Sequence, residues 1–219
     1  MSEWWTYSLS DFLLFSPRTY YRLFDLYNTA FWPAHVLALA IGLAIPALLV
    51  LGGSHRWNHV AGILLAACWL WVAWAFLFTR YATINWAATW FASLFMVQAV
   101  LLVLAGAAGG EFRATSRLRR AGAVALFIFA LLIQPLIGPL MGRPWTQVEV
   151  FGMAPDPTAL GTLGFALLLP TPGRRWLLLV IPLLWCAISG ATLWTMGSPD
   201  ALVLPAAGLL ALSIAALRR

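Results

Sequence analysis

Long apolar runs separated by short polar stretches make up most of the chain. A helix needs about 20 apolar residues to cross about 30 Å of hydrocarbon. Runs of about that length lie at residues 29–52, 58–78, 85–107, 121–141, 176–194 and 201–217. A shorter run, 157–171, reaches only roughly 22 Å as a helix. The pattern predicts an all-α protein, a polytopic transmembrane helix bundle of about seven spans. The alternative is six spans plus a re-entrant segment.

The shorter run has clear end signals. Asp156 is a good N-cap residue, and Pro157 suits the first helical position. Pro172 and Gly173 end the run. We therefore expect Asp156 to cap a helix that starts at the outer membrane boundary.

Residues 1–28 do not span and form an N-terminal segment, whereas residues 29–217 form the bundle. Ser16 and Pro17 predict a helix start. The helix that follows is amphipathic, with Tyr20, Leu23, Phe24 and Tyr27 on one face and Arg18, Arg22 and Asp25 on the other. Such a helix either lies in the outer membrane interface or docks on a partner subunit.

Composition excludes a soluble domain. Hydrophobic residues make up 63% of the 219 positions and charged residues 9%, and the net charge is +6. Ordinary soluble domains have about 25% charged residues. The arginines lie between apolar runs, which is typical of membrane topology signals and argues against nucleic-acid binding.

The arginines also predict an orientation. With seven spans, Arg18, Arg22, Arg80 and Arg143 fall on one side and the other nine arginines on the opposite side. Positive charge collects on the cytoplasmic side, so the N-terminus is expected outside and the C-terminus inside. Tryptophans follow the same boundaries: Trp4, Trp5, Trp32, Trp86, Trp145 and Trp194 at the outer one, Trp57 and Trp176 at the inner one.

Ionisable residues are scarce within the predicted spans, and an intramembrane ionisable residue is the usual mark of a functional site, so the sequence argues against a proton-coupled pump. No catalytic motif, metal-ligand cluster or pair of haem ligands is present in the sequence, so we expect no catalytic residues, no metal and no cofactor. One set of polar residues falls at the predicted outer face: Asn28, His35, Arg80, Asn85, Glu149 and Asp156. These residues are either loop and cap residues facing water or the lining of a small outward-facing pocket.

Three stretches resemble the uncharacterised membrane-protein family DUF6064. They are Tyr27–His35, the segment from Trp69 to Ala88, and Phe151–Thr158, with Pro182–Trp185 in addition. The resemblance covers roughly residues 20–217. It implies a compact bacterial multi-spanning bundle with no established activity.

The chain departs from the family pattern at three places. The family tends to have Tyr-His at Phe76-Leu77, Cys at Asp156 and Gln at His35. A metal or thiol reaction built on the family's His and Cys is therefore not available here in the same form.

These features favour a non-catalytic accessory or assembly subunit of a larger membrane complex in the bacterial inner membrane. Its partners would be the lipid bilayer and other membrane subunits bound through the N-terminal helix. The alternative is a small-solute transporter with a 3+1+3 helix core and an outward-facing polar pocket. The core is suggested by similar openings at His55-Arg56-Trp57 and Arg174-Arg175-Trp176. A membrane enzyme fits least well.

Overall fold

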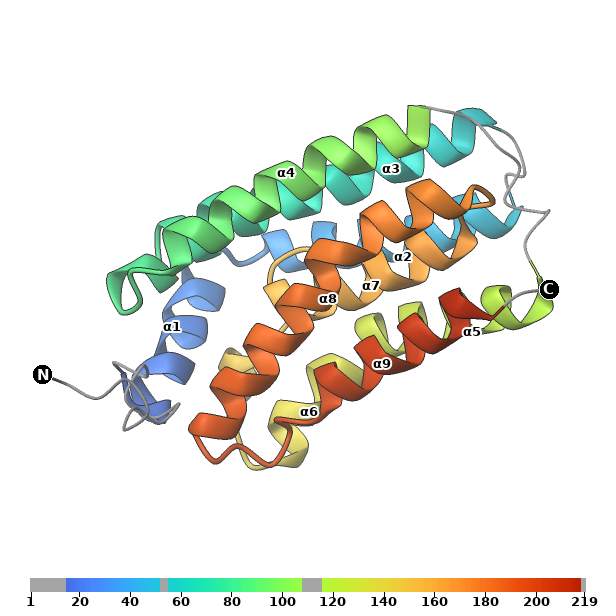
Figure 1. Ribbon diagram of the computed structural model, residues 1–219. Coiled ribbons are helices and arrows are strands. Elements are labelled where there is room, and N and C mark those ends of the chain that lie inside the picture. Colours follow the sequence, from blue (N-terminus) through green and yellow to red (C-terminus); the bar gives the residue numbers. More distant parts are fainter. Residues whose placement is uncertain (1–14, 52–54, 108–115, 218–219) are drawn as a thin grey trace, which may run out of the picture.

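The computed structural model describes residues 15–51, 55–107 and 116–217, and this part of the chain is helical without strands (Figure 1). The predicted all-α class is confirmed. Predictions that concern Trp4, Trp5 and the other residues before position 15 lie outside the described residues, as do those on Arg113, Arg218 and Arg219. The α-helices are α1 (Pro17–Ala30), α2 (Ala34–Leu51), α3 (His55–Trp71), α4 (Ala88–Ala107), α5 (Arg117–Ile128), α6 (Gln134–Leu140), α7 (Pro155–Leu168), α8 (Pro172–Thr195) and α9 (Val203–Ala216).

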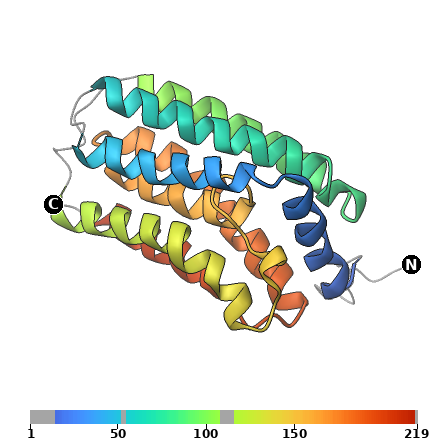
Figure 2. The same cartoon turned by 180° about the vertical axis from the view of Figure 1, so that it is seen from behind.

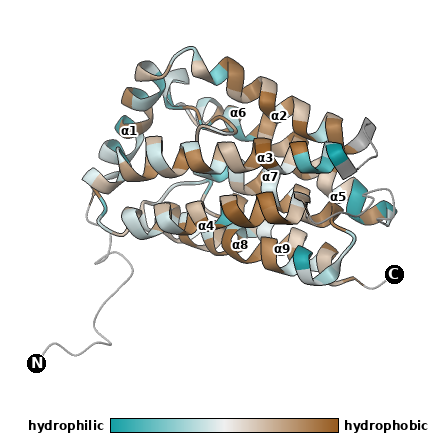
Figure 3. Cartoon of the chain, turned by 90° about the horizontal axis from the view of Figure 1, so that it is seen from above, coloured by the Kyte–Doolittle hydropathy of each residue, from teal (hydrophilic) through white to brown (hydrophobic). Residues whose placement is uncertain are grey.

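Two helices continue through π-helical turns. The π-helix η3 (Val72–Phe78) extends α3, and η6 (Phe129–Ile133) joins α5 to α6. Short 3-10 turns, η4 (Tyr81–Thr83) and η7 (Trp145–Gln147), lie in the connections. The long helices run side by side along one axis, and Figure 3 shows apolar residues along most of their length.

Length and composition support fewer full spans than the seven predicted. Among the described residues, four continuous helical stretches are long and apolar enough to cross a membrane: 56–83, 88–107, 117–140 and 172–195. A fifth passes if α1 and α2, which meet at a 94° bend, are taken together. The 157–171 run forms α7, which has 14 residues and reaches only roughly 21 Å. The reason for the difference is that α7 and α9 are too short to cross alone.

Helix α1 has the predicted start and the predicted amphipathic face. The Ser16 Oγ accepts a hydrogen bond from the Thr19 N–H at 3.2 Å, and Pro17 follows as the first helical residue. The apolar face does not remain available to lipid or to a partner, however. Phe24 is buried, and its ring lies 4.7 Å from the ring of Phe76 in η3.

Tyr27 completes the attachment of α1 to the bundle. Its hydroxyl donates to the Met153 carbonyl oxygen at 3.0 Å and accepts from the Trp71 Nε1–H at 2.8 Å. The face expected in the membrane interface or on a partner thus packs on the chain's own η3 and α3. The sequence pattern marks the face as apolar, but only the tertiary packing shows what covers it.

Close helix packing depends on glycine in the α3–α4 pair. A Cβ on Gly62 would lie 2.9 Å from the Leu102 carbonyl oxygen, and one on Gly106 would lie 3.3 Å from the Asn58 carbonyl oxygen. Small residues of this kind let helix backbones approach each other in membrane proteins.

Helix α7 is the centre of the bundle, and all its residues are buried. It packs chiefly against α5, α8 and α9. Figure 2 shows the connecting segment 141–154, which includes the 3-10 turn η7, passing into the bundle before α7 begins. Residues 141–148 stay at the surface, whereas 149–154 and α7 are buried, so a short irregular stretch and a half-length helix lie inside the protein.

Candidate functional site

Asp156 is not the helix cap that the sequence predicted. The N-cap of α7 is Ala154, and Asp156 lies in the first turn. The turn is held instead by Thr158, whose hydroxyl donates to the Ala154 carbonyl oxygen at 2.7 Å and accepts from the Gly152 N–H at 2.9 Å. The side chain of Asp156 is therefore free for contacts outside its own helix.

The Asp156 carboxylate is held by two donors from α8. Its Oδ1 accepts from the Trp185 Nε1–H at 2.7 Å, and its Oδ2 accepts from the Ser189 hydroxyl at 2.8 Å. All three residues are buried, and Asp156 is 2% exposed. Both oxygens of the Asp156 side chain are thus fixed by donors from α8.

The contacts with α8 place this carboxylate well inside the protein. Ser189 and Trp185 precede the end of α8, at Thr195, by six and ten residues. At 1.5 Å per residue they lie roughly 9 and 15 Å from that end. Asp156 was expected at the outer boundary, so this is a correction: a titratable group lies at depth among the helices.

Glu149 is the second buried acid of the site. It is 7% exposed, and its Oε2 has no hydrogen-bond partner among the described residues. The side chains of Gln134 and Asp156 are its hydrogen-bonding neighbours, and Arg143 and Asp200 lie within electrostatic reach. Two buried acids therefore lie side by side, with one arginine in reach.

An ion pair borders the two carboxyls. The Arg143 Nη2 lies 2.7 Å from the Asp200 Oδ2, and the Arg143 guanidinium lies 4.4 Å from the centroid of the Tyr21 ring. The Tyr21 hydroxyl also hydrogen-bonds the Ser198 hydroxyl at 2.9 Å. Counting Glu149 with them, the site holds more acidic than basic side chains.

Asn28 and His35, both in the predicted set, form a latch at the α1–α2 bend. The Asn28 Nδ2 donates to the carbonyl oxygens of Thr146 at 2.8 Å and Val148 at 2.9 Å. These two bonds orient the amide, so its Oδ1 accepts from the His35 Nε2–H at 3.0 Å. The latch thus joins η7 and Val148 to the end of α1 and the start of α2.

A cavity of about 490 Å³ opens beside this latch. Its lining includes two exposed indoles, Trp32 and Trp145, together with both latch residues. Volumes of about 300–1,000 Å³ are typical of small-molecule pockets. Of the six residues in the predicted outer-face set, Asn28 and His35 line this cavity, and its walls are mainly aromatic and aliphatic.

One extended segment separates the cavity from the carboxyls. Val148 and Val150 line the cavity, whereas Glu149 between them is buried beside Asp156. Successive side chains of an extended chain point to opposite sides, and Val148 has extended backbone angles. The cavity and the two carboxyl groups therefore lie on opposite sides of a single backbone segment, residues 148–150.

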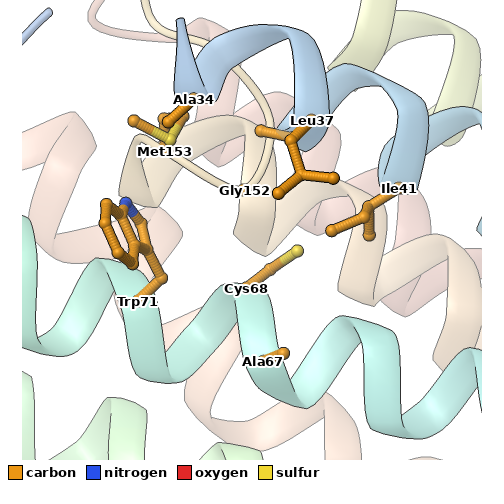
Figure 4. A pocket seen from close by; sticks show the side chains of 9 residues that line it. Ala34, Leu37, Ile41, Ala67, Cys68, Trp71, Gly152 and Met153 are labelled. Carbon is orange, nitrogen blue, oxygen red and sulfur yellow. The ribbon is translucent and has the colours of Figure 1, made fainter. Parts of the chain in front are cut away.

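A second cavity, of about 190 Å³, lies on the other side of α2 (Figure 4). Leu37 and Ile41 of α2 face Cys68 and Trp71 of α3 across it. Its lining is apolar, and Cys68 is a buried free thiol, as expected for a small core residue. The first half of α2 is thus flanked by cavities on two sides.

The remaining two predicted residues do not join the carboxyls. The Asn85 Oδ1 accepts from the Ala87 N–H at 3.0 Å, which is a local turn contact before α4. Arg80 is half-buried near Tyr27. Conversely, the predicted set does not contain Gln134, Trp185 or Ser189, since each lies in an apolar run, although Trp185 belongs to one of the stretches that resemble the family. Within the described ranges, no cluster of three or more His, Cys, Asp or Glu side chains suits a metal ion.

Comparison with known proteins adds a family but no activity. No curated protein and no solved structure matches the chain. Residues 18–219 match a family described as a family of unknown function, DUF6064. The resemblance seen in the sequence is therefore confirmed over almost the same range, and the chain belongs to the DUF6064 family.

Proposed function

We propose that this protein is a membrane transporter that exchanges a small organic cation for protons, with Glu149 and Asp156 as the exchange site. The observation that carries the proposal is the Asp156 carboxylate, held by Trp185 and Ser189 inside the bundle at the start of a fully buried half-length helix. Broken helices and buried carboxylates at depth are characteristic of ion and substrate sites in transporters.

The proposal includes seven passages through the bacterial inner membrane, with the N-terminus outside. The buried segment 149–168 would cross as a short irregular stretch followed by α7, and α9 would be a short final passage. Non-helical backbone at membrane depth is tolerated only where protein or a cavity surrounds it, and α7 is buried throughout. The arginine distribution supports the orientation.

A cation suits the charges of the site. Three acids, Glu149, Asp156 and Asp200, face one arginine, Arg143, in surroundings where unpaired charge is costly. The neighbouring cavity presents the rings of Trp32 and Trp145, and indole is the best cation–π partner among the side chains.

Exchange follows from competition for negative charge. When Glu149 holds a proton, the Glu149–Asp156 pair carries one negative charge instead of two. An incoming cation replaces that proton and restores the second negative charge. The groups facing the pair are Gln134 from α6, the Arg143–Asp200 ion pair, Tyr20 from α1, and Trp185 and Ser189 from α8. One proton leaves for each monovalent cation bound, so charge is conserved.

The accessory-subunit hypothesis has weaker support than the sequence suggested. It depended on an apolar face of α1 available for docking, and that face covers Phe76 and Tyr81 of the same chain. A partner would have to bind elsewhere on the surface.

The test uses proteoliposomes and a defined probe, tetraphenylphosphonium. We expect an outward proton gradient to drive its uptake by the wild type, and Asp156→Asn and Glu149→Gln to abolish the gradient-driven part. Asp25→Asn, which changes a half-exposed acid in α1, is the matched control and should keep full uptake. If smaller organic cations added in excess compete, the cavity takes this class of solute. Uptake equal to that of empty liposomes for every cation tried, or retained uptake in both acid variants, would overturn the proposal.

A further inference from the structure

The end of the bundle opposite α1 holds buried positive charge. The chain enters α5, leaves α7, enters α8 and leaves α9 at this end (Figure 1). Within the described ranges, the arginines at this end of the bundle are Arg56, Arg117, Arg119, Arg120, Arg174 and Arg175. The acids within the described ranges are Asp25, Glu149, Asp156 and Asp200, and none of them belongs to these four helix ends.

Two of these arginines are buried rather than solvated. Arg119 is 9% exposed and Arg175 is 3% exposed. Each donates one bond to a carbonyl oxygen at a helix end: Arg119 Nη2 to Leu217 at 2.9 Å, and Arg175 Nη1 to Leu169 at 3.4 Å. The Nε–H of each lacks a hydrogen-bond acceptor in the part of the chain that the structure describes.

These contacts do not balance the charge. Arg119 lies within electrostatic reach of Arg175 and repels it. The carbonyl ends of α7 and α9 each supply only about half a negative charge, and a buried charge is costly unless it is paired. The two guanidinium groups therefore leave net positive charge and unused N–H donors at this end of the bundle.

We propose that Arg119 and Arg175 together bind a phosphate group, that of an anionic phospholipid or of free phosphate. Guanidinium matches phosphate oxygens with two parallel N–H donors, and two such groups suit one tetrahedral anion. The site lies where α8 begins, next to Trp176, a half-exposed indole of the kind found at headgroup level. Basic pockets between helices at the cytoplasmic side are recognised sites for anionic headgroups. This proposal stands independently of the transport proposal, since it involves the other end of the molecule.

The test compares three proteins purified in a neutral detergent: wild type, Arg119→Gln with Arg175→Gln, and the control Arg56→Gln. Arg56 is an exposed arginine at the same end, so its change alters net charge without touching the pair. Thermal unfolding is followed with added phosphatidylglycerol, phosphatidylcholine or inorganic phosphate, and native mass spectrometry counts bound phosphatidylglycerol.

We expect phosphatidylglycerol to raise the unfolding temperature of the wild type and of Arg56→Gln, with phosphatidylcholine inactive. The double variant should bind at least about tenfold more weakly, the equivalent of one lost charged contact of about 1.4 kcal/mol. Without any anion it should be no less stable than the wild type, because the repulsion is gone while glutamine can still donate to the carbonyls. Each single variant gives the same comparison if the double variant does not fold.

The outcomes separate the sources of the anion. Protection by inorganic phosphate equal to that by phosphatidylglycerol assigns the site to free phosphate, and protection by the lipid alone assigns it to a headgroup. Equal anion protection of the double variant and the wild type would overturn the proposal. So would a double variant that is destabilised to the same extent with and without anion, because the arginines would then serve only as caps of α7 and α9.

Discussion

The contact between Asp156 and Trp185 can be measured by a double-mutant cycle. Asp156→Ala removes the acceptor of the indole N–H, and Trp185→Phe removes the donor while keeping an aromatic ring between Phe91 and Phe95. If Asp156 were only a helix cap, the two changes would be independent. The cycle therefore distinguishes the buried contact from the cap predicted from the sequence.

The expected magnitude follows from the geometry. A hydrogen bond to a charged group contributes about 1.5–3 kcal/mol, and the 2.7 Å distance between Trp185 Nε1 and Asp156 Oδ1 is typical of a strong one. Asp156→Ala alone should destabilise by about 1–3 kcal/mol, since it leaves a buried indole N–H unpaired. Asp156→Asn should cost less, because the amide oxygen can accept from Trp185 and the amide nitrogen can donate to Ser189.

Unfolding in mixed micelles with increasing sodium dodecyl sulfate gives the four free energies of the cycle. We expect a coupling energy of about 1.5–3 kcal/mol between the two sites. Trp90→Phe, which alters a tryptophan that is 67% exposed, is the control and should be additive with Asp156→Ala. A coupling energy below about 0.5 kcal/mol at Trp185 is within ordinary additivity and would refute the buried contact.

Two further predictions concern the same fold. Gly62→Ala should destabilise by about 1–3 kcal/mol in the micelle assay, because its Cβ would meet the Leu102 carbonyl oxygen at 2.9 Å, whereas Gly173→Ala, with nothing within 4 Å, should not; equal effects would contradict the α3–α4 packing. Tyr27→Phe should cost about 1–3 kcal/mol and increase protease cleavage near α1, since the hydroxyl bonds both Met153 and Trp71; unchanged cleavage would argue against the docked α1.

Much of the architecture could be predicted from local pattern. Apolar runs with few charges specify membrane-type helices, because helix formation satisfies the backbone within each segment. Ser16 and Pro17 mark the start of α1, and the spacing of Tyr20, Phe24 and Tyr27 defines its apolar face. These features depend only on neighbouring residues, so the sequence alone determines them. The Asn28–His35 pair was also within reach, since both belong to one predicted outer-face group.

The site itself depended on contacts between distant parts of the chain. Asp156 has a good N-cap residue type at a helix start, yet Thr158 holds the turn and the carboxylate bonds Trp185 and Ser189 about thirty residues away. Glu149 is an ordinary loop residue in the sequence and a buried acid in the fold. The same holds for the apolar face of α1, whose cover could be lipid, a partner or the chain itself. Amphipathic patterning specifies that a face is buried, but only tertiary packing decides which surface covers it. The reason is that the hydrophobic effect depends on the apolar area removed from water and is non-directional.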